Sequence, residues 1–323
     1  MAVPLLDVRD LSVAYLSEAG DVGAVDHVDL AVEAGEFVAL VGESGCGKST
    51  LVFAIARLLA PPSEQTGGTI TFRGEDLVHL RGEALRHLRW RDYSVVMQSA
   101  MNALNPMKSL EAQFGDAMRA HEHVSRSAIR QRTVEVLRLV GIDPVHRQSY
   151  PHQLSGGMRQ RAMIAMALLF SPSLILMDEP TSALDVVAQR SLMGQITQLQ
   201  RELGFAVVFV THDMSLVSHY SDRLVVMYAG QVVEAAPTAT LFGRPLHPYS
   251  RGLFDAFPSI RGPRTRLTGI PGSPPDLRRP PAGCRFHPRC PVVMEACRTQ
   301  APRLADQDGT LVRCLRYPGS AAT

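Results

Sequence analysis

Short and nearly continuous apolar runs recur along the first 240 residues of the chain. The runs at 36–41, 174–177 and 207–210 have the length of strands and show little of the alternation of a half-exposed sheet. Such runs are typical of parallel strands that are covered on both faces. The first of them ends at a glycine-rich turn, which adds a candidate site at the end of a strand.

Longer segments of mixed composition lie between these runs. Residues 49–60 and 187–203 have the length and residue types of helices, and Pro61 and Pro62 follow the first. Residues 223–229 and 231–234 predict a late hairpin with Gly230 near its turn. A stretch at about 100–170 is mostly helical in pattern and predicts an inserted helical subdomain. Together these segments predict an α/β fold.

Composition narrows the class of protein without changing this fold. The chain has 323 residues, 46% hydrophobic and 20% charged, which excludes a mainly disordered, collagen-like or small disulfide-rich protein. The net charge of +2 gives no overall argument for nucleic-acid binding. The longest apolar run, 162–170, is far shorter than the roughly 20 residues needed to cross a bilayer. The N-terminus lacks a signal-peptide pattern, so we expect a cytosolic protein.

Charge and proline are unevenly distributed. Residues 241–323 hold 13 arginines against 5 acidic residues, 13 of the 22 prolines and four of the five cysteines. Such a shift in composition marks a domain boundary. We therefore predict one domain over residues 1–240 and a loop-rich extension over residues 241–323.

The segment Gly42–Ser49 carries the first chemistry. It fits the pattern G-x-x-x-x-G-K-[ST], with an apolar strand before it and a predicted helix after it. Its glycines let successive N–H groups turn toward an anion, and the helix N-terminus adds positive potential. Lys48 is expected to reach the β- and γ-phosphates of ATP and Ser49 to ligate Mg²⁺, whereas Cys46 reads as a small neutral residue. The predicted nucleotide-binding residues of this loop are Gly42, Ser44, Gly45, Cys46, Gly47, Lys48, Ser49 and Thr50. The alternative is a glycine-rich turn that matches by chance.

A second acidic site follows the strand at 174–177. Asp178 and Glu179 are two carboxylates in succession at the strand's end. Asp178 is a candidate Mg²⁺ ligand, directly or through water. Glu179 is a candidate general base for the attacking water. The alternative is an exposed acidic pair at a strand end, which is common in isolation.

The run LSGGMRQ at 154–160 resembles the signature motif of ATP-binding cassette (ABC) ATPases. The resemblance implies that Ser155, Gly156 and Gly157 face the γ-phosphate of ATP bound to a partner subunit. Two cassettes would then enclose two ATP molecules head to tail. The resemblance also implies a P-loop NTPase fold with an antiparallel β subdomain at its N-terminus.

Four more positions match landmarks of the same family. Gln98 matches the glutamine that senses the γ-phosphate and the metal, which makes it a further candidate Mg²⁺ ligand beside Ser49 and Asp178. Asp185, in the run Ser182-Ala183-Leu184-Asp185, matches the D-loop, and His212 matches the switch histidine. Tyr15 lies where the family stacks an aromatic ring on adenine. The resemblance thus implies an active ATPase in which Glu179, His212, Gln98 and Lys48 carry the catalysis.

Sequences outside the cassette are similar to one branch of this family. These are SAMNALNP after Gln98, the run PLHPYS at 245–250, IPGSPP at 270–275 and GCRFHPRCP at 283–291. They resemble the ATP-binding subunits of oligopeptide/dipeptide (nickel) permeases over essentially the whole chain. The resemblance implies a bacterial importer, in which the cassette is peripheral on the cytoplasmic face of the inner membrane. Its expected partners are two transmembrane permease subunits, a second cassette (a paralogue or a second copy) and an extracytoplasmic solute-binding protein. Peptide is the expected cargo, and nickel or a sugar is the alternative.

Four cysteines lie in the extension, at Cys284, Cys290, Cys297 and Cys314. A disulfide is not expected in a reducing compartment, and the spacing is not that of a zinc knuckle. Four thiolates in a loop-rich segment can hold an iron–sulfur cluster or Zn²⁺, or they can simply be packed and reduced. The family resemblance favours a [4Fe–4S] cluster, with Zn²⁺ as the alternative.

A soluble ABC ATPase that acts on nucleic acid is the alternative function. The basic extension would then be a nucleic-acid patch. Against this, the extension lacks interleaved aromatic residues, and soluble members usually carry two cassettes in one chain, whereas this chain has one. We therefore expect no nucleic-acid partner. A simple P-loop kinase has no use for the signature motif.

Overall fold

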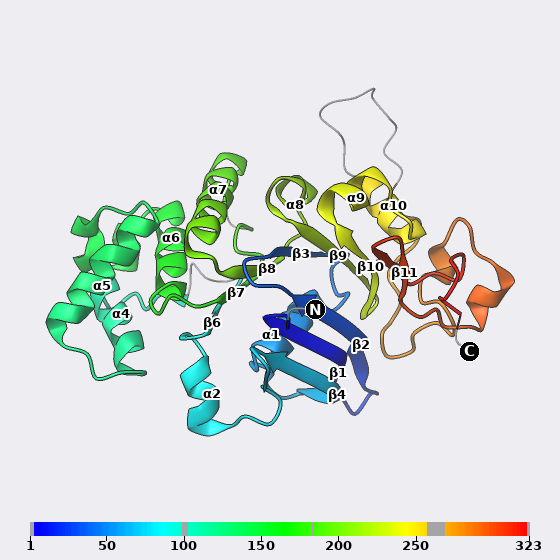
Figure 1. Cartoon of the computed structure of the whole chain (residues 1–323), viewed down its shortest axis with the longest axis horizontal. Coiled ribbons are helices and arrows are strands. Elements are labelled where there is room, and N and C mark those ends of the chain that lie inside the picture. Colours follow the sequence, from blue (N-terminus) through cyan, green and yellow to red (C-terminus); the bar gives the residue numbers. More distant parts are fainter. Residues whose placement is uncertain (1–2, 99–102, 183, 257–268, 322–323) are drawn as a thin grey trace. The chain divides into compact units, whose positions relative to one another are not determined.

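The computed structural model describes residues 3–98, 103–182, 184–256 and 269–321. The chain forms two compact units. The first comprises Met1–Val32, Phe37–Val78 and Val210–Thr323, and the second comprises Glu33–Glu36 and His79–Phe209. In Figure 1 the first unit is coloured blue and yellow to red, and the second is mostly cyan to green.

An antiparallel sheet begins the first unit. Its strand order is β2-β1-β4-β5, formed by β1 (Leu6–Tyr15), β2 (Val22–Val32), β4 (Ser63–Phe72) and β5 (Glu75–Asp76). Leu6, Val8, Leu11 and Val13 of β1 are buried, so one face of the sheet is apolar. This sheet is the antiparallel β subdomain that the family resemblance implies.

A second set of strands in the first unit has the order β11-β12-β10-β9-β3. The strands are β3 (Phe37–Val41), β9 (Arg223–Tyr228), β10 (Gln231–Pro237), β11 (Ala305–Gln307) and β12 (Thr310–Val312). Strand β3 pairs with β9 in parallel, and β9 and β10 form the predicted hairpin around Gly230, whose φ is +85°. Strand β10 runs beyond the predicted residue 234 because residues 235–237 continue to pair with β9, and Glu234 and Ala235 also pair with β12 from the extension.

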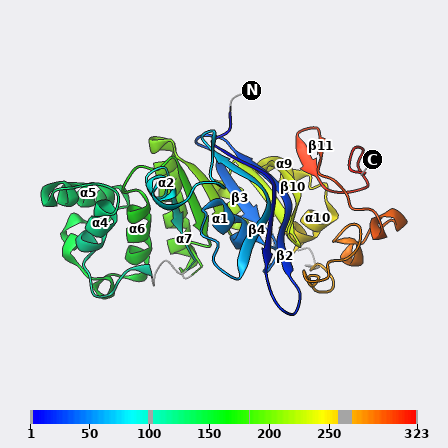
Figure 2. The same cartoon turned by 90° about the horizontal axis from the view of Figure 1, so that it is seen from below.

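The first unit contains α1 (Lys48–Ile55), α8 (Met214–Tyr220), α9 (Thr238–Gly243) and α10 (Pro248–Asp255). Helix α1 ends earlier than the predicted residue 60. The cause is local, because Arg57 takes a left-handed conformation with φ of +56°, and the N–H of Leu58 bonds back to the carbonyl of Phe53. Residues 269–321 are mostly loops, with short turns of helix at His287–Arg289 and Glu295–Arg298, as Figure 2 shows.

Aromatic side chains hold the extension to the hairpin within the first unit. The ring of Tyr228 in β9 lies 4.6 Å from that of Tyr249 in α10 and 5.2 Å from that of Phe286. All three side chains are buried. Such offset and edge-to-face pairs stabilise packing beyond simple burial. The extension is therefore anchored beside the end of β9.

The described part of the second unit has three strands in the order β8-β7-β6, namely β6 (Tyr93–Val96), β7 (Leu174–Asp178) and β8 (Ala206–Val210). The apolar residues of β7 and β8 are fully buried, as predicted, and β6 and β7 are parallel. Its helices are α2 (Gly82–Leu88), α4 (Leu110–Arg119), α5 (Arg126–Leu139), α6 (Gly156–Ala167) and α7 (Val186–Leu203). Two turns of 3-10 helix occupy Pro144–Gln148 and Pro151–Gln153.

Helices α4, α5 and α6 gather at one end of the second unit (Figure 1). They form the predicted helical block at about 100–170, of which residues 100–102 lie outside the described part of the chain. Residues Ala162, Ile164 and Ala165 of α6 are buried, as their uniformly apolar neighbourhood predicts. None of the helices in the described ranges is long and apolar enough to span a membrane.

Candidate functional site

The glycine-rich loop Gly42–Ser49 connects β3 to α1 in the first unit. A Cβ atom at Gly42 would lie 2.2 Å from the carbonyl oxygen of Met227, and one at Gly47 would lie 2.1 Å from that of Ala24. Both glycines also have positive φ, 150° and 102°. Only glycine fits such a backbone so close to its neighbours. The loop is therefore fixed tightly against β2 and the end of β9.

Lys48 is buried within this loop. Its ammonium donates to the carbonyl oxygens of Gly42 at 2.8 Å and Glu43 at 3.0 Å. The loop thereby holds a positive charge at the point where the phosphates are predicted to bind. Cys46 is also buried, and this burial raises the pKa of its thiol, so it carries no charge at neutral pH. This agrees with its interpretation as a small neutral residue.

Tyr15 lies at the end of β1, and its hydroxyl shares a hydrogen bond of 3.1 Å with the hydroxyl of Thr50 in α1. The predicted adenine contact and the predicted phosphate loop are thus joined within one unit. Ser44, Gly45 and Ser49 belong to the same loop and helix start. His212 follows β8 and is exposed, and the next residue, Asp213, caps α8 by accepting from the N–H of Ser215 at 2.8 Å.

The second unit carries the acidic pair at the end of β7. Asp178 is 3% exposed, while Glu179 is partly exposed and takes a positive φ of 45°. A left-handed conformation in a residue other than glycine is strained and is often found at functional sites. The side-chain amide of Gln98 donates to the Glu179 carboxylate at 2.9 Å. The structure therefore brings together two of the predicted catalytic side chains.

The signature motif begins α6. The Ser155 side chain caps this helix by accepting from the N–H of Met158 at 3.3 Å, and Gly156 and Gly157 form its first turn. A Cβ atom at Gly157 would meet nothing within 4 Å, so the surface there is open within the described chain. Helix α7 begins in the same manner, because Asp185 accepts from the N–H of Ala188 at 2.9 Å. Of the D-loop residues, Ala183 lies outside the described part of the chain.

Two residues of the extension contact the phosphate loop, and the sequence analysis missed both. The Tyr249 hydroxyl accepts from the N–H of Glu43 at 2.9 Å. The Arg289 guanidinium donates to both carboxylate oxygens of Glu43. No short-range pattern signals these contacts, because 206 and 246 residues separate the partners. A carboxylate inside a phosphate-binding loop was the one available hint that a cation lies nearby.

The four cysteines of the extension line one small cavity of about 10 Å³ together with His287. All four carry free thiols. Burial raises the pKa of Cys284 to about 11 and also raises the pKa values of Cys290 and Cys314. A metal ligand must be the thiolate, and within the described ranges no three His, Cys, Asp or Glu side chains are placed to hold a metal ion. The thiols suit iron or zinc chemically, but their placement does not form a ligand group.

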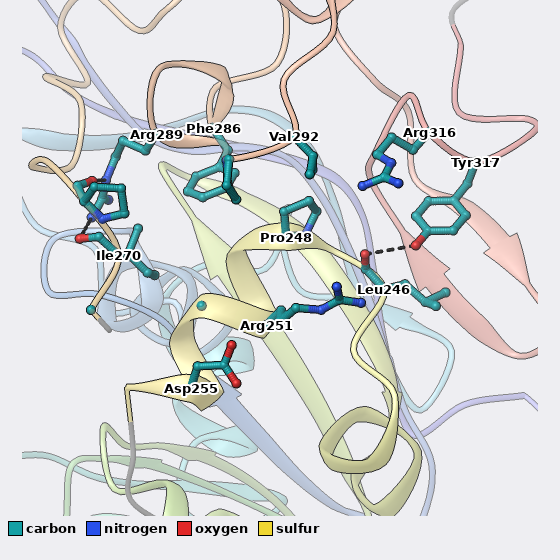
Figure 3. Close-up of a pocket in the computed structure, with 14 residues that line it drawn as sticks. Leu246, Pro248, Arg251, Asp255, Ile270, Phe286, Arg289, Val292, Arg316 and Tyr317 are labelled. Atoms are coloured by element: carbon teal, nitrogen blue, oxygen red, sulfur yellow. Dashed lines mark hydrogen bonds between the residues drawn. The ribbon is translucent and has the colours of Figure 1, made fainter. Parts of the chain in front are cut away.

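A larger cavity of about 330 Å³ lies between α10 and the loops of the extension. Figure 3 shows Arg251 and Asp255 on α10, and Arg316 and Tyr317 on the loop that follows β12. The Tyr317 hydroxyl donates to the carbonyl of Leu246 at 3.0 Å. Ile270, Phe286 and Val292 give the cavity an apolar wall, and Arg289 lies at its edge.

A phosphate loop at the start of α1, a buried aspartate followed by glutamate at the end of β7, and a Ser-Gly-Gly cap on α6 together define an ABC-type ATPase cassette. The chain belongs to the ABC transporter family, in its oligopeptide/dipeptide branch. Residues 25–182 match the family described as ABC transporter, and residues 233–297 match the C-terminal region of oligopeptide/dipeptide transporters.

Similar proteins cover almost the whole chain. A probable peptide ABC transporter ATP-binding protein of Sinorhizobium fredii is 43% identical over 97% of this chain and 95% of its own length. The dipeptide transport ATP-binding protein DppD of Caldanaerobacter subterraneus is 39% identical, with 97% of both chains covered.

Solved structures match the cassette portion. The dimeric bacterial ABC transporter cassette MJ0796 is 28% identical with a TM-score of 0.65, over 72% of this chain and 98% of its own. A second structure of that cassette is a dimeric post-hydrolysis state bound to ADP and phosphate. The cbiO1 cassette of Clostridium perfringens is 26% identical with a TM-score of 0.66, over 75% of this chain and 92% of its own.

Proposed function

We propose that this chain hydrolyses ATP to drive the import of di- and oligopeptides across a bacterial inner membrane. The observation that carries the proposal is the match to peptide-transport ATP-binding proteins at about 40% identity over both the cassette and the C-terminal region. A cassette alone is common to importers, exporters and soluble ATPases. The C-terminal region is what narrows the function to this branch.

We propose that the predicted residues act in ATP hydrolysis in the following roles. The Gly42–Ser49 loop binds the phosphates, with Lys48 on the β- and γ-phosphates and Ser49 on Mg²⁺. Asp178 is the second Mg²⁺ ligand, and Glu179 takes the proton of the attacking water. The hydrogen bond from Gln98 to Glu179 supports this role, because it orients the carboxylate. His212 contacts the γ-phosphate, and Tyr15 stacks on adenine.

Each ATP site is completed by a second cassette, either a paralogue or another copy of this chain. Ser155, Gly156 and Gly157 contact the γ-phosphate held by that partner, and Asp185 lies at the interface. The open surface at Gly157 supports this assignment, because a phosphate can approach the helix N-terminus there. Binding of ATP closes the pair, and hydrolysis reopens it.

The catalytic role of Glu179 is tested by Glu179→Gln. We expect the ATPase rate to fall by about 10²–10⁴, because the amide cannot accept the proton, while ATP binding persists. Glu202→Gln is the matched control, since Glu202 is an exposed carboxylate of α7 that accepts a hydrogen bond from the side-chain amide of Gln198 at 2.8 Å. A Glu179→Gln variant that keeps its full rate would show that another group is the base.

Transport is tested by purification and by uptake. After mild solubilisation of membranes, the tagged chain should co-purify with two permease subunits and a second cassette, as a peripheral protein of the cytoplasmic face. Cells lacking the chain should lose uptake of labelled peptides delivered by a solute-binding protein, but keep uptake of nickel and sugars. Loss of nickel or sugar uptake instead would assign the alternative cargo. Recovery only with nucleic acid would contradict the transport function.

We also propose, as a separate point, that the four thiols are a candidate site for a [4Fe–4S] cluster, with Zn²⁺ as the alternative. The supporting observation is that Cys284, Cys290, Cys297 and Cys314 share one cavity, although they are not placed as ligands. The test is iron, sulfide and zinc analysis of chain purified without oxygen, compared with a Cys290→Ala variant. Absence of all three elements would leave the thiols as packing residues.

A further inference from the structure

Glu43 places a negative charge inside the loop that receives the phosphates of ATP. It is the second residue of the Gly42–Ser49 loop, and its carbonyl oxygen holds the Lys48 ammonium at 3.0 Å. An uncompensated carboxylate at this position would repel a polyanion. The loop therefore needs a cation that neutralises Glu43 without occupying the phosphate position.

Arg289 from the extension supplies that cation. Its two terminal nitrogens donate to the two Glu43 carboxylate oxygens at 2.7 and 2.9 Å. The Arg289 side chain is 5% exposed and the Glu43 side chain is 26% exposed, so solvent screens the pair only in part. A bidentate pair of this kind fixes orientation as well as charge. The Glu43 hydrogen bonds also raise the pKa of Arg289, which keeps the guanidinium charged.

The arginine is itself held in place. Its Nε donates to the carbonyl of Pro271 at 2.8 Å, and its guanidinium lies 5.8 Å from the ring centre of Tyr228. Figure 3 shows Arg289 against the backbone at Ile270, at the edge of the larger cavity. Because the backbone of the extension and the ring of Tyr228 in β9 both fix Arg289, the contact with Glu43 is imposed by the fold of the first unit.

Tyr249 adds a contact to the backbone of the same residue. Its buried hydroxyl accepts from the N–H of Glu43 at 2.9 Å. Side chain and main chain of Glu43 are thus both held by the extension. The carbonyl that contacts Lys48 belongs to the same residue, so the position of the lysine ammonium depends on these contacts.

We propose that Arg289 is a positioning residue for ATP binding, which neutralises Glu43 and holds the start of the phosphate loop. The extension then sets the affinity of the cassette for ATP. This role concerns nucleotide binding by the ATPase and does not depend on which cargo is transported.

The test compares Arg289→Ala with the double variant Glu43→Gln/Arg289→Ala in the full-length chain. We expect Arg289→Ala to raise the Kd for a fluorescent ATP analogue about tenfold, because the Glu43 charge is exposed to the phosphates. The double variant should recover most of that affinity, since no carboxylate remains. The defect of Arg289→Ala should also shrink as salt is raised, because screening weakens the repulsion.

Two comparisons separate this role from a general loss of stability. Arg278→Ala is the matched control, since Arg278 is an exposed arginine of the extension paired with Asp276. It should leave the Kd unchanged. In a hydrolysis assay, Arg289→Ala should raise KM and leave kcat within about twofold of the unmodified chain. If Arg289→Ala does not fold, Arg289→Gln is used, which removes the charge but keeps a hydrogen-bond donor, and for which Glu43→Gln should again improve affinity. A lower melting temperature with unchanged Kd, or no rescue by Glu43→Gln, overturns the proposal.

Discussion

Replacing Gly47 by alanine tests the tight placement of the phosphate loop. The new methyl group would lie 2.1 Å from the carbonyl oxygen of Ala24, a backbone atom that cannot rotate away. The φ of +102° adds a conformational cost. A left-handed conformation costs an alanine about 1–2 kcal/mol, and overpacking costs about 1–3 kcal/mol more. We therefore expect the variant to lose about 2–5 kcal/mol of unfolding free energy.

Gly45→Ala separates the two contributions. Gly45 has a φ of +78°, but a Cβ atom there would meet nothing within 4 Å. It should therefore show only the conformational cost. The difference between the two variants measures the steric cost of the contact between Gly47 and Ala24.

The assay is urea unfolding of the nucleotide-free chain, followed by circular dichroism. With an m-value of about 2 kcal/mol/M, an added loss of 2 kcal/mol lowers the midpoint by about 1 M. Unfolding without nucleotide keeps effects on ATP binding out of the comparison. Equal midpoints for Gly45→Ala and Gly47→Ala would refute the reasoning, because the close approach to β2 would then have no energetic consequence.

Two further changes test the surroundings of the site. Burial lowers the pKa of His247 to about 3, so between pH 6.5 and 3 the unfolded chain binds a proton that the folded chain does not. The unfolding free energy should thus fall by about 1.4 kcal/mol per pH unit on acidification. The variant His247→Asn, whose side chain can still accept from the N–H of Tyr249, should reduce this slope. The slope is measured by urea unfolding between pH 7 and 5. Parallel pH profiles would contradict this. Asp185→Ala should lower the unfolding free energy by about 1 kcal/mol, because the N-cap of α7 is lost, whereas Asp185→Asn should lower it little. Equal urea midpoints for the two variants would argue against the cap.

The motifs that could be predicted are those confined to short stretches of chain. The phosphate loop, the acidic pair and the strands at 37–41, 174–178 and 206–210 all follow from patterns within about ten residues. The buried apolar part of α6 follows in the same way. Helix ends were less predictable, because the end of α1 depends on the positive φ of Arg57 rather than on the prolines after it.

The contacts of the extension could not be predicted. Arg289 is one of 13 arginines in the last 83 residues, and nothing in its neighbourhood marks it as the partner of Glu43. Pairing of β10 with β12 likewise depends on distant residues that carry no periodic signal. Four cysteines in a loop-rich segment and the family resemblance predicted a cluster site, but the sequence does not determine where thiols point once the loops are packed.

The first compact unit combines residues up to 78 with residues from 210 onward. During synthesis, the phosphate loop therefore leaves the ribosome long before β9, Tyr249 and Arg289 exist to hold it. At about 5–20 residues per second, the delay between residues 78 and 289 is about 10–40 s. Until residue 228 has emerged β3 lacks its partner β9, and throughout the interval the loop lacks Arg289. A nascent chain of this protein therefore completes the contacts of its phosphate loop only after its C-terminal region has emerged.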